Sequence, residues 1–380
     1  MKETMIIPCD EGYGALKEYL TDKGVHRVFL VCGKSSERLE IGRFFHRLED
    51  EGTLEVVRFS DFTPNPEISS AYAGIRLCRE KKCYMIAAIG GGSPMDVAKC
   101  VKLFYNADLN EDVTTQDCEP CDLPFLAIPT TAGSGSEATR FAVVYRDRKK
   151  LSITDDDALP DAVLLDPDTL AGLPGYQKKA TLLDALCHAV ESYWSVNATK
   201  ESREYGREAI RLIVANYASY VAEDPAARAP MMRASNLAGK AINIARTTAG
   251  HAMCYKLTTG YGLAHGHAAA LCVDALWKWM AQEKLREAGS EELEETLRQL
   301  SVIITGNEAA GPSDGAAFFH ELVYDKLAME RPKLRSSLPE EADAELAPLA
   351  EYVNPERLKN HPVDLDHETL MKLYRRIAQV

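Results

Sequence analysis

The stretch Tyr84–Tyr105, YMIAAIGGGSPMDVAKCVKLFY, joins a short apolar run to an amphipathic run through three glycines. The run Tyr84–Ile89 predicts a strand that is covered on both faces, as in a parallel sheet. Ser93 and Pro94 favour the start of a helix, so the pattern predicts that a helix follows and extends over Val97–Tyr105. A glycine turn between a strand and a helix lets a phosphate approach free backbone N–H groups, although such a turn also occurs as a purely structural feature.

The same alternation of strand and helix continues on both sides of this stretch. Further strands are predicted at Arg27–Cys32, Leu54–Phe59, Phe125–Pro129 and Ala162–Asp166, and further helices at Ser36–Glu51 and Glu67–Lys81. Such an alternation predicts a doubly wound parallel sheet. After Pro174 the patterns are helical to the end of the chain. We therefore expect an α/β domain with a doubly wound parallel sheet over residues 1–174, followed by an all-helical domain over residues 175–380.

A second polar loop, Thr130–Glu137, follows the predicted strand Phe125–Pro129 directly. It is rich in hydroxyl side chains and spaced by glycines. Parallel sheets bind their ligands outside the carboxyl ends of their strands. Because this loop and the glycine turn follow neighbouring strands, we expect them to converge on one ligand-binding cleft.

One carboxylate and four histidines stand at short spacings in the second half of the chain. Asp184 and His188 are four residues apart in a helical pattern, so both point to one side of the helix. His251 and His265 have small or apolar neighbours, and His267 follows two residues later. One such histidine alone is usually a core or cap residue, but buried imidazoles need partners, and a shared ion supplies one. A carboxylate with several imidazoles suits Fe, Zn, Ni or Co.

The composition limits the class of partner. The chain has 380 residues, enough for two domains, of which 46% are hydrophobic and 27% charged. Its formal net charge of -13 argues against binding to nucleic acid or to an anionic membrane surface, which needs clustered positive charge. No run approaches the ~18 to 20 apolar residues of a membrane span, and the start MKETMIIPCDEG has no signal-peptide pattern. We expect a cytoplasmic protein that acts on a small molecule.

Four motifs resemble, in order along the chain, the signatures of the iron-containing (group III) alcohol dehydrogenases. They are Gly90–Lys99 (GGGSPMDVAK), Pro129–Thr139 (PTTAGSGSEAT), Pro160–Pro174 (PDAVLLDPDTLAGLP) and Asp184–Tyr193 (DALCHAVESY). The resemblance implies a dinucleotide-binding N-terminal domain, a helical C-terminal domain and a divalent ion, Fe²⁺ or Zn²⁺. It implies as metal ligands Asp184, His188, His251 and His265. We expect a homodimer or a higher homo-oligomer.

The resemblance also implies a nicotinamide cofactor bound by the two loops. The predicted cofactor-binding residues are Gly91, Gly92 and Ser93 at the pyrophosphate, with Asp96, Thr130, Thr131 and Ser134 beside them, and Gly33, Lys34 and Ser35 at the adenosine ribose. NAD-preferring members of the family tend to have an acidic residue in the loop that corresponds to Gly33–Ser35, where it binds the ribose hydroxyls. Here Lys34 and its hydroxyl neighbours suit a 2'-phosphate. We therefore predict NADPH rather than NADH.

The region around His251 departs from the common family pattern. Tyr255 stands four residues after the ligand, where the family usually has a further histidine. Arg246 and Lys256 stand five residues before and after His251, and a guanidinium with neighbouring hydroxyls suits a tetrahedral dianion. The segments RTTAGHAMCYKLT and LAHGHA resemble the hydroxyethylphosphonate dehydrogenase branch, whose members reduce phosphonoacetaldehyde. We therefore predict Arg246 and Lys256 as substrate-binding residues.

The predicted reaction is the reduction of a small aldehyde, with phosphonoacetaldehyde as the specific candidate and 2-hydroxyethylphosphonate as its product. The metal would act as a Lewis acid, the nicotinamide would deliver hydride, and a proton would arrive through His267, Tyr255 or water. One alternative is a generic NADPH-dependent dehydrogenase of uncharged medium-chain aldehydes, which has no need of Arg246 and Lys256. A lyase resembling dehydroquinate synthase is a second, although its first metal ligand is normally Glu rather than Asp184. A non-catalytic metal or nucleotide binder is the third.

Overall fold

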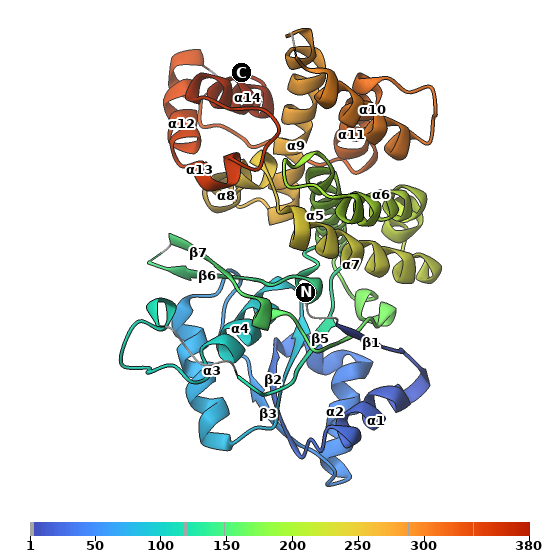
Figure 1. Ribbon diagram of the computed structural model, residues 1–380, viewed down its shortest axis with the longest axis vertical. Coiled ribbons are helices and arrows are strands. Elements are labelled where there is room, and N and C mark those ends of the chain that lie inside the picture. Colours follow the sequence, from blue (N-terminus) through green and yellow to red (C-terminus); the bar gives the residue numbers. More distant parts are fainter. Residues whose placement is uncertain (1–3, 117–120, 148, 288, 337) are drawn as a thin grey trace. The chain divides into compact units, whose positions relative to one another are not determined.

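The computed structural model describes residues 4–116, 121–147, 149–287, 289–336 and 338–380. The chain divides into two compact units, an N-terminal unit, Met1–Gly172, and a C-terminal unit, Leu173–Val380. Figure 1 shows strands and helices in the first and helices in the second. Among the described residues, no helix is both long and apolar enough to cross a membrane.

The N-terminal unit is built on a six-stranded sheet. In spatial order its strands are β1 (Met5–Ile7), β8 (Ala162–Leu164), β5 (Phe125–Pro129), β4 (Met85–Gly90), β2 (Arg27–Cys32) and β3 (Glu55–Phe59). All neighbouring pairs are parallel. The five strands predicted from the sequence are present, with ends that differ by at most two residues. β1 was not predicted, because a strand of three residues is too short to show a periodic pattern.

Helices cover both faces of this sheet (Figure 1). They are α1 (Gly14–Asp22), α2 (Glu40–Asp50), α3 (Ile68–Lys81) and α4 (Gly92–Leu103). Successive side chains of a strand point to opposite faces. Phe29 and Val31 of β2 therefore pack in one core with α3 and α4, whereas Val28 and Leu30 pack in another with α1 and α2. The doubly wound α/β prediction is confirmed.

Two local features of this unit differ from the sequence prediction. α4 begins at Gly92 with Gly91 as its N-cap, so Ser93, the predicted N-cap, lies inside the helix, and Pro94, the predicted first helical residue, is the third. The chain also forms an antiparallel hairpin of β6 (Phe141–Arg146) and β7 (Lys149–Thr154), which was not predicted. The turn of this hairpin contains Asp147 in the left-handed region, with a φ of 50°, instead of the usual glycine signal.

The described part of the C-terminal unit contains helices and no strand. The helices are α5 (Gly175–Trp194), α6 (Lys200–Val221), α7 (Arg228–Ala245), α8 (Ala249–Tyr261), α9 (His265–Gln282), α10 (Glu291–Thr305), α11 (Pro312–Glu321), α12 (Pro339–Glu351), α13 (Pro355–Leu358) and α14 (His367–Ala378). α9 is the central one, because it packs against α5, α8, α11 and α14. Its residues from Gly266 to Trp277 are all buried. A helix that is apolar on all sides is expected at the centre of a bundle, and the prediction of a helical second part is confirmed.

Candidate active site

The two predicted cofactor loops lie in contact with each other at the carboxyl ends of β4 and β5. Gly90 has a φ of 154°, and a Cβ there would lie 2.3 Å from Cγ of Pro94, so the strand can enter this turn only with glycine. A Cβ on Gly91 would lie 3.2 Å from the Thr131 side chain, and one on Gly92 would lie 3.8 Å from Ser134. The structure thus brings together Gly91, Gly92, Thr131 and Ser134, as the sequence predicted for one ligand cleft.

Lys99, a residue of α4 with no assigned role in the sequence, fixes the second loop. Its fully buried ammonium donates to the backbone oxygens of Ser136, Thr139 and Phe141 at 2.7 to 2.8 Å. Burial of the Asp96 carboxyl raises its pKa to about 7, against the opposing charge of Lys99. Lys99 therefore holds the loop against the helix, and Asp96 lies beside it, within 3.4 Å of the Ser136 hydroxyl.

The loop after β2 lies next to the glycine turn. The hydroxyl of Ser36 donates to the backbone oxygen of Ile89, the penultimate residue of β4, at 3.3 Å. Gly33 is the N-cap of the short turn that follows. Lys34 and Ser35 are both exposed, and Lys34 forms no ion pair within the described part of the chain. This loop therefore offers a free cation beside the predicted pyrophosphate loop.

Three of the predicted metal ligands meet in the C-terminal unit. Asp184 and His188 come from α5, and His251 comes from the first turn of α8. Each is buried, and one ligand atom of each lies within 4.8 Å of the others. His251 Nε2 lies 3.4 Å from Asp184 Oδ1, and the rings of His188 and His251 stack at 4.5 Å. Asp184 and His188, four residues apart on α5, thus point to the same side of the helix, as the sequence predicted.

His265, the fourth predicted ligand, lies beside this group at the first residue of α9. Its ring centre is 5.4 Å from that of His251. Burial alone would raise the pKa of Asp184, but the charges of the three histidines outweigh burial and hold it well below its usual range. Asp184, His188, His251 and His265 are called the Asp–His cluster below.

A second carboxylate, Glu191, supports the cluster from behind and was not predicted. It is fully buried on α5 and contacts Nδ1 of His251 through one oxygen. Its other oxygen accepts from the backbone N–H of Thr248 at 2.9 Å and from the Thr248 hydroxyl at 2.6 Å. Burial would raise the pKa of Glu191, but His251 and these hydrogen bonds lower it to about 2. An ionised Glu191 thus occupies Nδ1 of His251 and leaves Nε2 directed toward Asp184.

Behind Glu191 lies a further layer of polar and aromatic side chains. The Thr248 hydroxyl accepts from the indole N–H of Trp194 at 2.9 Å and lies 3.4 Å from Nδ1 of His361. Burial lowers the pKa of His361 to about 4, although the charge of Glu191 acts in the opposite direction. His361 is therefore neutral at ordinary pH. His251 is thus supported, through Glu191, by side chains from α5, from Thr248 before α8 and from the segment that contains His361.

The two predicted proton donors differ in their surroundings. The Tyr255 ring lies nearly parallel to that of His265, with 5.8 Å between centres and an interplanar angle of 18°. His267 points elsewhere, because Nδ1 lies 3.1 Å from the Tyr176 hydroxyl and Nε2 lies 2.8 Å from the backbone oxygen of Glu330. Both ring nitrogens of His267 are therefore already engaged.

The predicted substrate-binding cations also differ. Arg246 is the C-cap of α7, exposed, and has a φ of 62°. The Lys256 ammonium lies 3.7 Å from the centre of the Tyr352 ring. A third cation, Arg357, was not predicted and lies over the ring of Tyr255, the neighbour of His265. Its guanidinium is 5.4 Å from the centre of the Tyr255 ring.

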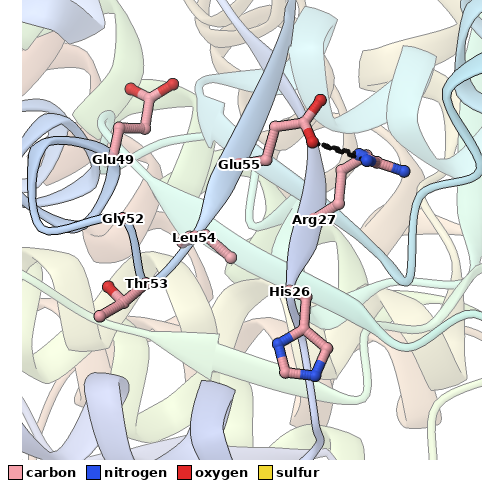
Figure 2. Close-up of a pocket in the computed structure, with 7 residues that line it drawn as sticks. All are labelled: His26, Arg27, Glu49, Gly52, Thr53, Leu54 and Glu55. Carbon is pink, nitrogen blue, oxygen red and sulfur yellow. Dashed lines mark hydrogen bonds and ion pairs between the residues drawn. The ribbon is translucent and has the colours of Figure 1, made fainter.

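A separate open depression of about 520 Å³ lies in the N-terminal unit (Figure 2). Its lining residues are His26, Arg27, Glu49, Gly52, Thr53, Leu54 and Glu55. Arg27 and Glu55 are the first residues of β2 and β3 and form an ion pair of 2.7 Å across it. The depression is thus at the amino ends of these strands, opposite to the cofactor loops. None of the predicted site residues lines it.

Comparison with known proteins identifies the family. Residues 8–167 match the family of iron-containing alcohol dehydrogenases, and residues 178–378 match the C-terminal family of Fe-containing alcohol dehydrogenases. Alcohol dehydrogenase 4 of Saccharomyces cerevisiae is 31% identical over 314 residues, which cover 77% of this chain and 82% of that protein. The chain belongs to the iron-containing alcohol dehydrogenases.

Two further similar proteins are named for the aldehyde that they reduce. Phosphonoacetaldehyde reductase of Streptomyces viridochromogenes is 36% identical over 232 residues, which cover 58% of each chain. Sulfoacetaldehyde reductase of Bifidobacterium kashiwanohense, solved in complex with NAD+, is 27% identical, with a TM-score of 0.85 over 100% of this chain and 98% of that one. Both resemblances extend well beyond the metal-binding motif.

The residues present fit the divalent ion expected of an iron-containing alcohol dehydrogenase. A carboxylate oxygen and imidazole nitrogens are donors for a borderline metal such as Fe²⁺ or Zn²⁺. Ligating histidines in metalloproteins commonly donate their other ring N–H to a carboxylate, which is the arrangement of His251 with Glu191. The donor set and its support are therefore those of a metal site.

Proposed function

We propose that this dehydrogenase uses a divalent ion and a nicotinamide cofactor to reduce a small aldehyde. The buried convergence of Asp184, His188 and His251, with Glu191 behind it, carries this proposal. His265 is proposed as the fourth ligand, because its ring lies 5.4 Å from that of His251. A divalent ion held there supplies Lewis-acid polarisation of a carbonyl, and the reduced nicotinamide supplies hydride.

The protein's own side chains position the metal ligands and deliver the proton. Glu191 directs Nε2 of His251 toward Asp184 by holding Nδ1. Tyr255 is proposed to hold the proton that the product hydroxyl receives, because its ring lies beside His265. The engagement of both His267 nitrogens speaks against that residue as the donor and for a role in fixing the start of α9.

We infer that NADPH is preferred over NADH. The loop Gly33–Ser35 has no acidic side chain to bind the ribose hydroxyls. The exposed Lys34, which forms no ion pair among the described residues, supports binding of a 2'-phosphate. The pyrophosphate is assigned to Gly91, Gly92 and Ser93, with Thr130, Thr131, Ser134 and Asp96 completing the cofactor site.

We further infer that the substrate is a two-carbon aldehyde carrying a tetrahedral oxyanion, phosphonoacetaldehyde being the leading candidate. The similarity to a phosphonoacetaldehyde reductase and to a sulfoacetaldehyde reductase supports an anionic substrate. Arg246 and Lys256 remain candidates for binding it. Such a substrate needs local positive charge, because the chain as a whole carries a formal net charge of -13.

An assay of cofactor oxidation with a panel of aldehydes tests these proposals together. The purified protein is given phosphonoacetaldehyde, sulfoacetaldehyde and butanal, each with NADPH and with NADH, before and after removal of metal by a chelator. We expect activity that is lost with the metal and restored by Fe²⁺ or Zn²⁺, with a higher kcat/KM for NADPH. Full activity in a sample shown to be metal-free would contradict the metal proposal, and equal use of NADH would contradict the cofactor preference.

A further inference from the structure

Arg357 is a half-buried cation beside Tyr255, the neighbour of His265, although it lies far from the Asp–His cluster in sequence. It belongs to the short helix α13. Its Nη1 donates to the hydroxyl of Thr247 at 2.7 Å, and its guanidinium lies 5.4 Å from the centre of the Tyr255 ring. Both partners of Arg357 belong to the segment that carries His251.

Both contacts of Arg357 are with neighbours of the candidate ligands. Tyr255 lies nearly parallel to His265, so the same aromatic ring contacts both the guanidinium and that imidazole. Thr247 precedes Thr248, whose hydroxyl donates to Glu191, the carboxylate that holds His251. The guanidinium is therefore linked to His265 through one side chain, Tyr255, and to His251 through Thr247, Thr248 and Glu191.

The guanidinium also has unused binding capacity. No carboxylate among the described residues forms an ion pair with Arg357, whereas Arg58, Arg146 and Arg375 are each paired with an acidic side chain. A guanidinium has five N–H donors, and the structure gives one of them, on Nη1, an acceptor. The remaining donors form a planar fork that matches two oxygens of a phosphonate or a sulfonate.

The other two cations are less suited to this role. Arg246 is exposed, and exposed ion pairs are weakened by water and salt. The Lys256 ammonium lies over the ring of Tyr352, which is itself 55% exposed, so it is directed to the surface. Among the described cation–ring contacts, the guanidinium of Arg357 is the one over Tyr255.

We propose that Arg357 binds the tetrahedral oxyanion of the substrate and thereby selects charged two-carbon aldehydes over uncharged ones. This inference rests on the proposed function. Phosphonate and sulfonate both present tetrahedral oxygens that fit the guanidinium fork, but they differ in charge. Both are therefore tested. Thr247 and Tyr255 hold the guanidinium in place, which lowers the entropy lost when it binds the anion.

Steady-state kinetics of Arg357→Ala and Arg357→Lys with phosphonoacetaldehyde, sulfoacetaldehyde and butanal test the proposal. Charge-assisted hydrogen bonds of ~1.5 to 3 kcal/mol correspond to a factor of about 10 to 100. We expect Arg357→Ala to lower kcat/KM by that factor on one or both anionic aldehydes, mainly through KM, and by less than about threefold on butanal. Arg357→Lys should retain only part of the activity on the anionic aldehydes. The ammonium keeps the positive charge but lacks the planar fork.

Arg203→Ala is the matched control. Arg203 is also half-buried, lies 5.4 Å from the centre of a tyrosine ring, that of Tyr193, and donates one hydrogen bond to the backbone. In the described part of the chain, its hydrogen bond and its ring contact are both with Tyr193, outside the Asp–His cluster. Its replacement removes a similar stacking contact and should leave the ratio of activities on charged and uncharged aldehydes unchanged.

Chemical rescue separates a binding role from a structural one. Guanidinium chloride at millimolar concentration should restore part of the activity of Arg357→Ala on the anionic aldehydes, and sodium chloride at the same concentration should not. An equal loss on all three aldehydes, or a wild-type preference for butanal, would overturn the inference. A wild-type protein that reduces no aldehyde at all would instead overturn the proposed function.

Discussion

At the scale of single residues, Glu191 determines which nitrogen of His251 is available to an ion. Because the carboxylate holds Nδ1, Nε2 is the nitrogen available as a metal ligand. Nε2 lies 3.4 Å from Oδ1 of Asp184. Within the Asp–His cluster, the hydrogen bonds of Glu191 go to His251, so its effect on the site passes through the orientation of His251. It is a positioning residue, and its removal should be felt first in metal affinity.

We therefore expect Glu191→Gln to weaken binding of Zn²⁺ by a factor of about 10 to 100, which is typical of losing such a partner. The amide keeps the size of the side chain but lacks the negative charge that stabilises the ligand. Competition with a chromophoric chelator measures the Kd, and Glu204→Gln, on the exposed surface of α6, is the control. An unchanged Kd in a folded Glu191→Gln protein would show that Glu191 serves packing alone.

The sequence contained a signal for Glu191 but none for Arg357. Glu191 follows His188 by three residues and Asp184 by seven, so all three lie on one face of α5. The helical spacing that predicted Asp184 and His188 therefore applies to Glu191 as well. Arg357 reaches the site only because α13 packs against α8, more than one hundred residues away in sequence. No local pattern reports such a contact.

At the scale of helices, Gly266 allows α9 to approach α5 at the cluster. A Cβ at this position would lie 2.1 Å from the backbone oxygen of Ala180 and 2.5 Å from Cβ of Asp184. Neither is the flexible end of a side chain, so the helices would have to separate. The glycine between His265 and His267 is therefore required by the packing that presents Asp184 to the histidines.

Gly266→Ala should lower the free energy of unfolding by about 1 to 3 kcal/mol, the usual cost of overpacking, and should also weaken metal binding. Urea denaturation and the chelator competition measure the two effects. Gly260→Ala in α8 is the control, because a Cβ there meets nothing within 4 Å, and it should stabilise the helix by roughly 0.5 to 1 kcal/mol. Equal stability of the two variants would mean that α9 can shift without cost.

Elements were predicted well where their ends carry chemical signals. β2 and β5 were placed to the residue, because Gly33 follows one and Pro129 closes the other. α4 begins at Gly92, before the Ser93 and Pro94 that were expected to mark its start, because the glycine turn already supplies the bend. The hairpin of β6 and β7 has partly buried strands and no glycine turn, so neither periodicity nor turn chemistry indicated it.

At the scale of the whole molecule, each compact unit carries one half of the predicted machinery. The cofactor loops Gly33–Ser35, Gly91–Ser93 and Thr130–Ser134 all belong to Met1–Gly172, and the Asp–His cluster belongs to Leu173–Val380. The overall negative charge offers no general attraction for an anionic substrate. Binding of such a substrate therefore depends on local cations such as Arg357 rather than on the net charge. The position of these cations cannot be predicted from composition.

Stability as a function of pH should report the buried network behind the cluster. Burial lowers the pKa of His361 from 6.5 to about 4 in the folded protein. Between these two values the unfolded chain binds a proton that the folded protein excludes, so the contribution of His361 is complete above pH 6.5 and is lost as the pH falls toward 4. The shift corresponds to about 1.4 kcal/mol for each pH unit in this window, or about 2 kcal/mol at pH 5.

Urea unfolding of the metal-free protein at pH 7.5 and pH 5.0 measures this loss without interference from metal binding. We expect His361→Gln to reduce the difference in unfolding free energy between the two pH values by about 2 kcal/mol relative to wild type, because Gln does not titrate. Replacement of the exposed His46 by Gln should leave the difference unchanged. If wild type and His361→Gln lose the same stability on acidification, then His361 is protonated as readily in the folded protein as in the unfolded chain, and the layer behind Glu191 is open to water.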